Sequence, residues 1–303
     1  MIKFSAPGKI HLLGEHSVVY GKPALLTTVD LRVTVTLKSK TYNDTIVHMY
    51  GMIKKVVEGI VKKHLKIKTM PPHQLTISSQ LPIGAGLGSS AAISASCIAA
   101  LLTFLKVKWD LNLINNLTYE AEKVFHGNPS GADNAAVIYG GLIWYRKETD
   151  NLKLIQPLKI KNPLLKNFVL IHTGKPKETT KDMVTMVKKL SQKKPAILER
   201  FLKIQEQLTK ELLEALEQRH EKKLMSIIKM GENNLEKIGV VSKSVMPIIR
   251  KIESSYGASK ICGAGGKKGP TGILLCYHPN PSRLIQIAKS YNLPYFLAKL
   301  GVE

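Results

Sequence analysis

Three glycines at every second position, Gly84, Gly86 and Gly88, are followed directly by the serine pair Ser89 and Ser90. An alanine-rich run begins at these serines and predicts a helix, so the glycines form the loop that enters it. Glycine lets the backbone approach a ligand closely, and the first N–H groups of a helix have no partner within the helix. Because the positive end of the helix dipole points the same way, this pattern favours binding of phosphate groups.

The glycine loop fits neither of two common nucleotide-binding patterns. No lysine follows Gly88, as the pattern G-x-x-x-x-G-K-[ST] requires, and the third glycine comes too early for the pattern G-x-G-x-x-G. A tight turn between a strand and a helix, with a serine as the helix cap, is the alternative that the loop alone leaves open.

The segments around the loop predict the elements that must position it. Residues 31–39 and 73–80 predict strands, the first from its alternation of apolar and polar residues, and residues 52–65 between them have helical spacing. Residues 131–145 contain a glycine pair followed by a strand-like run. The loop therefore lies between a strand that ends near residue 80 and a helix that begins near Ser89.

A second structural unit is predicted after residue 160. Two prolines precede the run NFVLIHT, which has the composition of a buried strand. Residues 178–256 are helical by pattern, and the residues after them return to strand-like runs with glycine, then a short helix and a last strand. We expect an N-terminal domain over residues 1–160 and a C-terminal domain over residues 161–303.

Composition restricts the class of protein. The chain has 303 residues, 44% of them hydrophobic, which is enough for a substantial core in one or two domains. Its start has no continuous apolar core of a signal peptide, and we expect no membrane-spanning segment. Three cysteines without a Cys-x-x-Cys pair favour neither a disulfide framework nor a zinc site. A cytoplasmic protein is expected.

The charge is strongly positive, with 45 Lys+Arg against 22 Asp+Glu and a net charge of +23. Such an excess attracts polyanions, and RNA is the first partner to consider. The lysines are spread along helical segments, however, and aromatic residues are only 6% of the chain, whereas RNA-binding surfaces commonly use aromatic side chains to stack on bases. We expect a basic surface suited to small acidic substrates and no specific nucleic-acid partner.

Three segments resemble the signatures of the GHMP kinase superfamily. They are residues 6–25 (APGKIHLLGEHSVVYGKPAL), 81–92 (LPIGAGLGSSAA) and 263–273 (GAGGKKGPTGI). Within the superfamily, GEHSVVYGKPAL is similar to the mevalonate kinases rather than the galactokinases, and HGNPSGADN at residues 126–134 is more specific to the mevalonate kinases. The resemblance spans both ends and the middle of the chain.

The resemblance implies a two-domain α+β GHMP kinase fold with the active site in a cleft between the domains. It implies ATP and Mg²⁺ as cofactors and transfer of the γ-phosphoryl group to an alcohol, here the 5-hydroxyl of (R)-mevalonate. Another small-molecule kinase of the superfamily, such as phosphomevalonate kinase, is one alternative. A non-catalytic RNA-binding protein is the alternative from another class, and a homodimer is left open.

The same resemblance implies roles for individual residues. Asp133 matches the general base, Lys9 matches the cation beside it, and Ser90 and Glu122 match the magnesium ligands, which is the chemistry that phosphoryl transfer requires. The implied substrate contacts are Lys9, Glu15, His16, Asp133 and Thr180, with Thr179 as the rival of Thr180. The ATP phosphates are expected against Pro82, Gly84, Ala85, Gly86, Leu87, Gly88, Ser89 and Ser90.

The third signature departs from the pattern of its relatives, because Lys267 and Lys268 interrupt its glycine run. Lysine tolerates a positive φ poorly. Either these two positions have ordinary backbone angles, or the loop is shaped differently.

Overall fold

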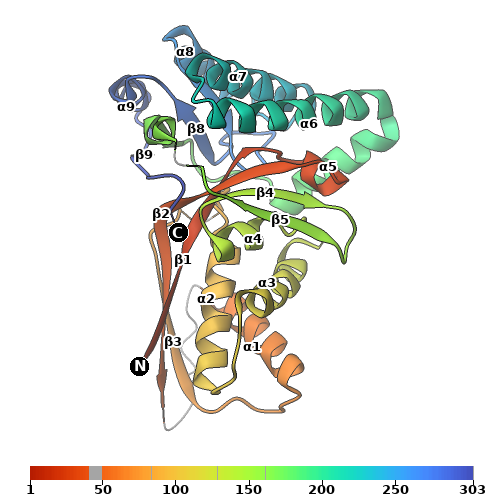
Figure 1. Cartoon of the computed structure of the whole chain (residues 1–303), viewed down its shortest axis with the longest axis vertical. Helices are drawn as coiled ribbons and strands as arrows, with labels where there is room; N and C mark the ends of the chain where they lie inside the picture. The colour runs from red at the N-terminus through yellow and green to blue at the C-terminus, as the bar shows by residue number, and fades with distance from the viewer. Residues whose placement is uncertain (41–49, 83, 128, 161, 303) are drawn as a thin grey trace.

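The protein is described by a computed structural model that covers residues 1–40, 50–82, 84–127, 129–160 and 162–302. It contains two antiparallel sheets, each accompanied by its own helices. In Figure 1 the first sheet and its helices form the lower part of the molecule, and the second sheet and its helices form the upper part.

The first sheet consists of five strands among the described residues: β1 (Ile2–Leu13), β2 (Ala24–Ser39), β3 (His73–Ser79), β4 (Leu142–Lys147) and β5 (Lys153–Leu158). Their order is β1-β2-β4-β5, with β3 also paired to β2, and every pair is antiparallel. Strand β2 is long enough to pair with β4 along its first part and with β3 along its second part.

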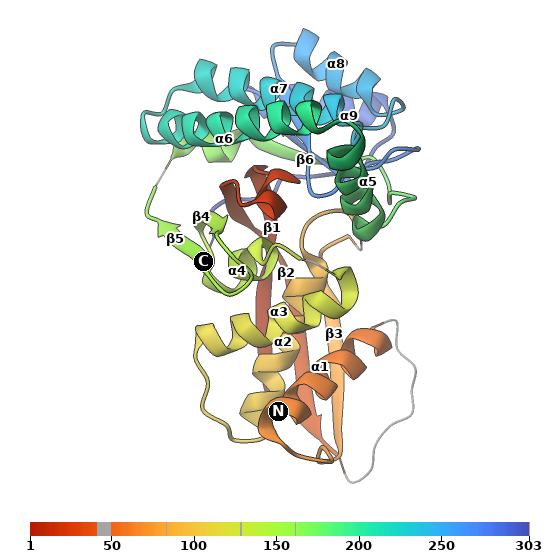
Figure 2. The same ribbon diagram turned by 90° about the vertical axis from the view of Figure 1, so that its right-hand side faces the viewer.

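Four helices accompany the first sheet: α1 (Gly51–Leu65), α2 (Ser89–Phe104), α3 (Leu111–His126) and α4 (Ala132–Tyr139). Helix α2 is central, because it contacts β1, β2 and the three other helices. All of its residues from Ala91 to Leu102 are buried. A helix that is apolar on every side belongs in the interior, and its many alanines let neighbouring elements approach closely. Figure 2 shows these helices in front of the sheet.

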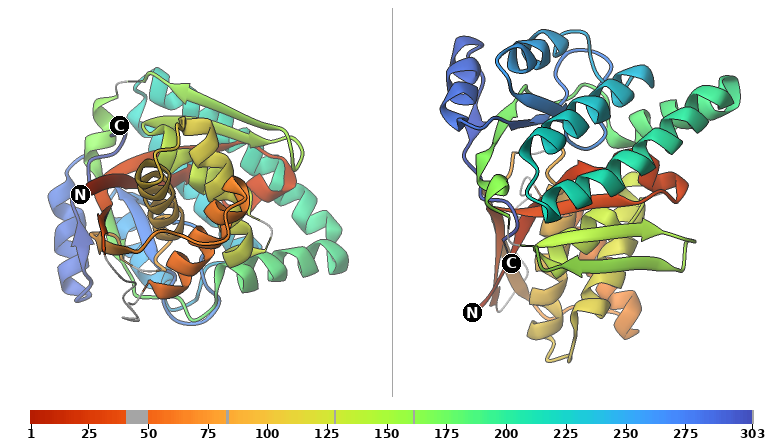
Figure 3. Two further views of the ribbon diagram at one scale, coloured as in Figure 1. Left: turned by 90° about the horizontal axis from the view of Figure 1, so that it is seen from below. Right: turned by 45° about the horizontal axis from the view of Figure 1, so that its top comes forward.

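The second sheet has the strand order β7-β8-β6-β9, formed by β6 (Phe168–His172), β7 (Ala258–Ile261), β8 (Ile273–Tyr277) and β9 (Tyr295–Phe296). Its helices are α5 (Thr180–Lys193), α6 (Pro195–Glu217), α7 (Glu221–Lys237), α8 (Met246–Ser254) and α9 (Pro281–Ser290). Helices α6 and α7 pack against each other at the outside of the molecule (Figure 3). Two short 3-10 helices are η1 (Ser17–Tyr20) and η2 (Pro163–Asn167). None of the described helices is both long enough and apolar enough to cross a membrane.

Strand β1 joins the two halves. It is buried on both faces from Ala6 to Leu13, because it contacts α2 and α4 of the first half and α6 and α7 of the second. The end of the chain also returns to the first sheet, where Leu300 forms a bridge with Val29. The chain passes from one sheet to the other between residues 158 and 168, and the expected division at residue 160 stays a prediction.

Two local predictions need correction. The strand expected at residues 31–39 begins earlier, at Ala24, because residues 24–29 are buried on both faces and therefore show no alternation. Over residues 131–145 only a glycine pair and a strand-like run were expected, but the segment begins with α4, and Asp133 lies in its first turn. Gly131 is the N-cap residue with φ of 89°, a left-handed backbone conformation that favours glycine.

Candidate active site

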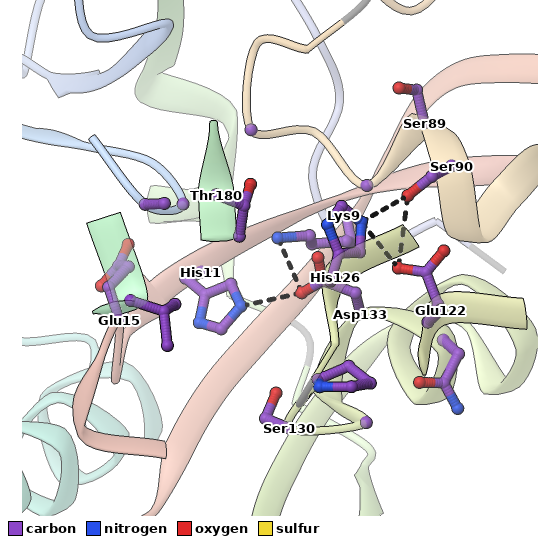
Figure 4. A pocket seen from close by; sticks show the side chains of 18 of the residues that line it. Lys9, His11, Glu15, Ser89, Ser90, Glu122, His126, Ser130, Asp133 and Thr180 are labelled. Carbon is purple, nitrogen blue, oxygen red and sulfur yellow. Dashed lines mark hydrogen bonds and ion pairs between the residues drawn. The ribbon is translucent and has the colours of Figure 1, made fainter. Parts of the chain in front are cut away.

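A cavity of about 410 Å³ lies where the two halves meet. In the first half, its described lining comes from β1, η1, the start of α1, the glycine loop with the start of α2, the end of α3 and the start of α4. In the second half, it comes from the start of α5 and from Gly263 and Ala264 of the loop between β7 and β8. Figure 4 shows the polar side chains of several of these elements pointing toward one another. Segments distant in sequence therefore share a single site.

Lys9 and Asp133 form an ion pair in this cavity, with 2.9 Å between Lys9 Nζ and Asp133 Oδ1. Lys9 is buried in β1, and a buried ammonium group requires a partner of opposite charge. His11 Nε2 lies 3.2 Å from the same carboxylate oxygen (Figure 4). Since Lys9 and His11 are two positions apart on one strand, they project from the same face.

Burial alone would raise the pKa of the Asp133 carboxyl, but the positive charge of Lys9 and the hydrogen bond from His11 outweigh it. The net pKa lies well below the usual range for aspartate, so the group is ionised at neutral pH. Its position in the first turn of α4 acts in the same direction, because the helix dipole stabilises negative charge there. Asp133 is therefore a carboxylate, ready to accept a proton.

A second polar group lies beside the first. Ser90 Oγ donates to Glu122 Oε2 at 3.2 Å, and His126 Nε2 lies 3.3 Å from Ser90 Oγ and 3.4 Å from Glu122 Oε2. Glu122 and His126 are four residues apart on α3, which places them on one face of that helix. The other carboxylate oxygen of Glu122, Oε1, is buried without a partner among the described residues. A buried carboxylate oxygen left in this way favours binding of a cation or of another hydrogen-bond donor.

The glycine loop is fixed by its neighbours on both sides. Leu87 O accepts a hydrogen bond from Lys9 N at 2.9 Å, and Ala85 O accepts one from Ile273 N at 3.0 Å. Gly88, with φ of 70°, is the N-cap of α2, and no side chain caps this helix, so the serine cap that the sequence left open is absent. The loop thus joins β1 of the first half to β8 of the second.

The reason for glycine at 86 and 88 differs from the expected one. A Cβ atom on Gly86 would lie 2.4 Å from Cys262 O, and one on Gly88 would lie 2.7 Å from Lys9 Cγ. These glycines therefore leave room for the chain between β7 and β8 and for the Lys9 side chain. A Cβ atom at position 86 would therefore collide with protein backbone.

Some of the expected substrate contacts already have hydrogen-bond or ion-pair partners within the protein. Thr180 lines the cavity at the start of α5, whereas the Thr179 side chain forms a capping box with Asp182, which favours Thr180 over its rival. Glu15 is buried in an ion pair with Lys260, and His16 Nε2 lies 3.1 Å from Ala264 O. Both still line the cavity. Burial lowers the pKa of the His16 imidazole, which favours its neutral form.

Both the sequence and the structure are similar to those of known proteins. Residues 51–141 match the family described as GHMP kinases N terminal domain. A mevalonate kinase of Archaeoglobus fulgidus is 29% identical over 296 residues, which is 94% of this chain and 96% of that protein. Residues 51–141 of this chain are therefore a GHMP kinase N-terminal domain.

Two solved structures show the same fold as this GHMP kinase. An L. major mevalonate kinase in complex with R-mevalonate has a TM-score of 0.80 at 22% identity. The match covers 96% of this chain and 91% of the L. major chain. A Streptococcus pneumoniae phosphomevalonate kinase in complex with phosphomevalonate and AMPPNP has a TM-score of 0.79 at 20% identity, over 99% and 100% of the two chains. The expected α+β GHMP kinase fold is confirmed, and the protein is an ATP-dependent small-molecule kinase.

The expected phosphate-binding residues of this GHMP kinase divide into two groups. Gly84, Gly86, Gly88, Ser89 and Ser90 line the cavity. The others do not, and they are Pro82, Ala85 and Leu87, of which Ala85 and Leu87 are buried in the core.

Lys267 and Lys268 lie in the loop between β7 and β8 of the GHMP kinase, and glycines take the positive φ angles of this loop. Positive φ angles occur there at Gly263, Gly265, Gly269 and Gly272, and the described residues with positive φ do not include either lysine. The lysines therefore occupy ordinary backbone positions, and the glycines of the loop adopt the left-handed ones.

Three residues of the kinase site are missing from the sequence prediction. His11 contacts Asp133, His126 contacts Ser90 and Glu122, and Lys260 pairs with Glu15. A periodicity of two from Lys9 along a strand identifies His11, and a spacing of four from Glu122 along a helix identifies His126. No local signal connects Lys260 with Glu15, because Glu15 lies in the turn after β1 whereas Lys260 lies in β7, far along the chain.

The contact between Gly86 and Cys262 predicts a loss of ATP binding in Gly86→Val. The valine must adopt a φ near 90° and displace the backbone at Cys262, so the loop moves away from its place in the cavity. A displacement of this kind lowers binding and turnover of ATP by about 10²-fold. Calorimetric titration with ATP and its Mg²⁺ complex measures the affinity.

Gly239→Val is the matched control, because Gly239 has φ of 76° and no atom lies within 4 Å of the added Cβ. That variant carries the same backbone strain without a collision, and its ATP affinity should remain that of the wild type. Unchanged affinity in a folded Gly86→Val variant would mean that the loop is only a turn.

Proposed function

We propose that this kinase transfers the γ-phosphoryl group of ATP to the 5-hydroxyl of (R)-mevalonate. The observation that carries the proposal is the Lys9–Asp133 ion pair at 2.9 Å inside the cavity of a GHMP kinase. This pair supports the proposal because phosphoryl transfer to an alcohol uses a proton acceptor and a positive charge close to the transferred group. The mevalonate kinase relatives that align over most of the chain support this choice of substrate.

The reaction needs little covalent chemistry from the protein. The acceptor oxygen forms a bond to the γ-phosphorus, the bond from that phosphorus to the ADP oxygen breaks, and the hydroxyl proton passes to Asp133. A carboxylate is a much weaker base than an alkoxide, so the proton moves only as the new bond forms and the hydroxyl becomes acidic. Lys9 then stabilises the negative charge that develops around the transferred group.

Mg²⁺ fits the second polar group of the site. Glu122 Oε1 is buried without a partner among the described residues, and Ser90 Oγ lies 3.2 Å from Oε2 of the same carboxylate. Mg²⁺ prefers oxygen ligands and takes only a few from the protein, so Ser90 and Glu122 would hold it. When bound, Mg²⁺ would neutralise part of the charge on the phosphates. Residues of the glycine loop would supply the N–H groups that face the phosphates.

The charge of the cavity favours mevalonate over phosphomevalonate. Among the described residues, Lys9 is the only lysine or arginine that lines the cavity. An acceptor that already carries a phosphate would need a further cation to balance that group after desolvation. Thr180, Glu15 and His16 are the proposed contacts for mevalonate, and all three line the cavity.

Coupled ADP release over mevalonate, phosphomevalonate, homoserine and galactose tests the proposal. With ATP and Mg²⁺, we expect turnover of mevalonate with kcat on the order of 1–100 s⁻¹, the range usual for kinases. Turnover of phosphomevalonate without turnover of mevalonate would overturn the choice of substrate and leave the kinase assignment intact.

A further inference from the structure

We propose that His11 is a positioning residue: together with Lys9 it holds one oxygen of Asp133, so that the other oxygen faces the acceptor hydroxyl. The inference rests on the proposed role of Asp133 as the base. It adds a residue for which the sequence comparison gave no role and which is part of β1 rather than of a loop.

Lys9 and His11 both contact one oxygen of the Asp133 carboxylate. Lys9 Nζ lies 2.9 Å and His11 Nε2 lies 3.2 Å from the same atom, Asp133 Oδ1. The side chains of Lys9 and His11 are 2% and 5% exposed, whereas that of Asp133 is 37% exposed. Because both buried donors contact Oδ1, Oδ2 is the oxygen that they leave available. Two donors from a rigid strand fix the rotation of the carboxylate more strictly than one.

The His11 imidazole faces the Asp133 carboxylate with its Nε2 atom. A carboxylate only accepts hydrogen bonds, so the Nε2 atom that faces it must carry the proton. Burial and the neighbouring charge of Lys9 lower the pKa of His11, so the imidazole is neutral and Nδ1 has no proton. Nδ1 is buried without a partner among the described residues. The contact with Asp133 is thus the hydrogen bond that this side chain makes within the described part of the chain.

The backbone of His11 is fixed by a contact with the second half of the molecule. Its backbone oxygen accepts a hydrogen bond from Lys260 Nζ at 3.3 Å, and Lys260 is fully buried in β7 of the second sheet. The strand that carries both donors is therefore anchored from the other half of the molecule. A group that is held in this way can maintain the orientation of Asp133 within the narrow limits that proton transfer requires.

Two amide variants separate positioning from packing. In glutamine, the amide nitrogen is as many bonds from Cβ as Nε2 is in histidine, whereas in asparagine it is one bond short. We expect His11→Leu and His11→Asn to lower kcat by roughly 10- to 100-fold, the span for loss of a hydrogen bond to a charged group, with KM for the acceptor within a few-fold. His11→Gln should keep kcat within a few-fold of the wild type. Equal loss in all three variants, or wild-type kcat in His11→Leu, would overturn the inference.

His73 offers the matched control, because its Nε2 lies 3.1 Å from Glu58 Oε1 and neither of these residues is part of the cavity lining. His73→Leu should lower thermal stability and leave kcat unchanged. A similar kcat loss there would show that any broken buried histidine pair slows the enzyme, which contradicts a specific role for His11.

The Asp133→Asn background tests the connection between the two residues. Adding His11→Leu to it should lower kcat by no more than about 2- to 3-fold, because the base that His11 positions is already gone. A full additional loss would contradict the inference. All ratios are taken on whichever acceptor the wild type phosphorylates, so a wrong choice of substrate does not affect this test.

Discussion

Asp133→Asn is expected to lower kcat by roughly 10²–10⁴-fold, the span that general acid–base catalysis contributes, while ATP affinity stays within a few-fold. Asparagine nearly keeps the shape of aspartate but accepts no proton and carries no charge. Single-turnover kinetics measures the chemical step, and titration with ATP measures binding. A folded Asp133→Asn variant with near wild-type turnover would show that Asp133 is a helix residue without a role in proton transfer.

Asp110→Asn is the control for this change. Asp110 is the N-cap of α3, and its side chain accepts a hydrogen bond from Leu113 N at 2.7 Å. Asparagine is an equally good cap, so kcat and stability should both be retained. The comparison separates the loss of a carboxylate near a helix start from the loss of the base.

Lys9→Met belongs in the same experiment because Lys9 and Asp133 are 2.9 Å apart. Lys9→Met alone should also lower kcat. If the two side chains act as a unit, the double variant loses much less than the product of the two single losses. Losses that multiply would instead mean that Lys9 acts on the phosphates independently of Asp133.

The largest effect on stability is expected for Lys260→Met. Lys260 is fully buried, and its ammonium group donates to Glu15, to His11 O and to Ile261 O. Removal of one partner of a buried ion pair leaves the other charge uncompensated and lowers the free energy of unfolding by about 3–5 kcal/mol. Denaturant titration at neutral pH measures this change.

Two further variants check the reason for that loss. Lys260→Met combined with Glu15→Gln removes both charges and should recover part of the stability. Lys22→Met breaks an ion pair at 2.7 Å whose side chains are 31% and 21% exposed, so it should cost no more than about 1 kcal/mol. Equal costs for Lys22→Met and Lys260→Met would contradict the account of Lys260 as a buried partner of Glu15.

Prediction of the fold from the sequence succeeded where local pattern and local structure agree. The strand expected at residues 73–80 is β3 and the helix expected at 52–65 is α1, because both elements have one face toward the core. The beginning of β2 was missed because it is buried on both faces. Helix α4 was missed because it is short and starts at a glycine with positive φ.

Prediction of the site depended on the resemblance rather than on spacing. Lys9 lies in a strand, and Asp133 lies in the first turn of a helix far along the chain. Nothing in the local sequence around either residue shows that the fold brings their side chains together. The periodicity of a strand or helix is enough to predict His11 and His126. His11 shares a strand face with Lys9, and His126 shares a helix face with Glu122. Lys260 was not, because its partner Glu15 becomes its neighbour only when the two sheets meet.

Phosphorus NMR of the wild-type reaction is the most direct test of the proposed function. With ATP, Mg²⁺ and (R)-mevalonate, we predict a new phosphomonoester signal that is split by the two protons of the neighbouring carbon and grows in step with ADP. Formation of ADP with inorganic phosphate alone, or a diphosphate product that appears only from phosphomevalonate, would contradict the account.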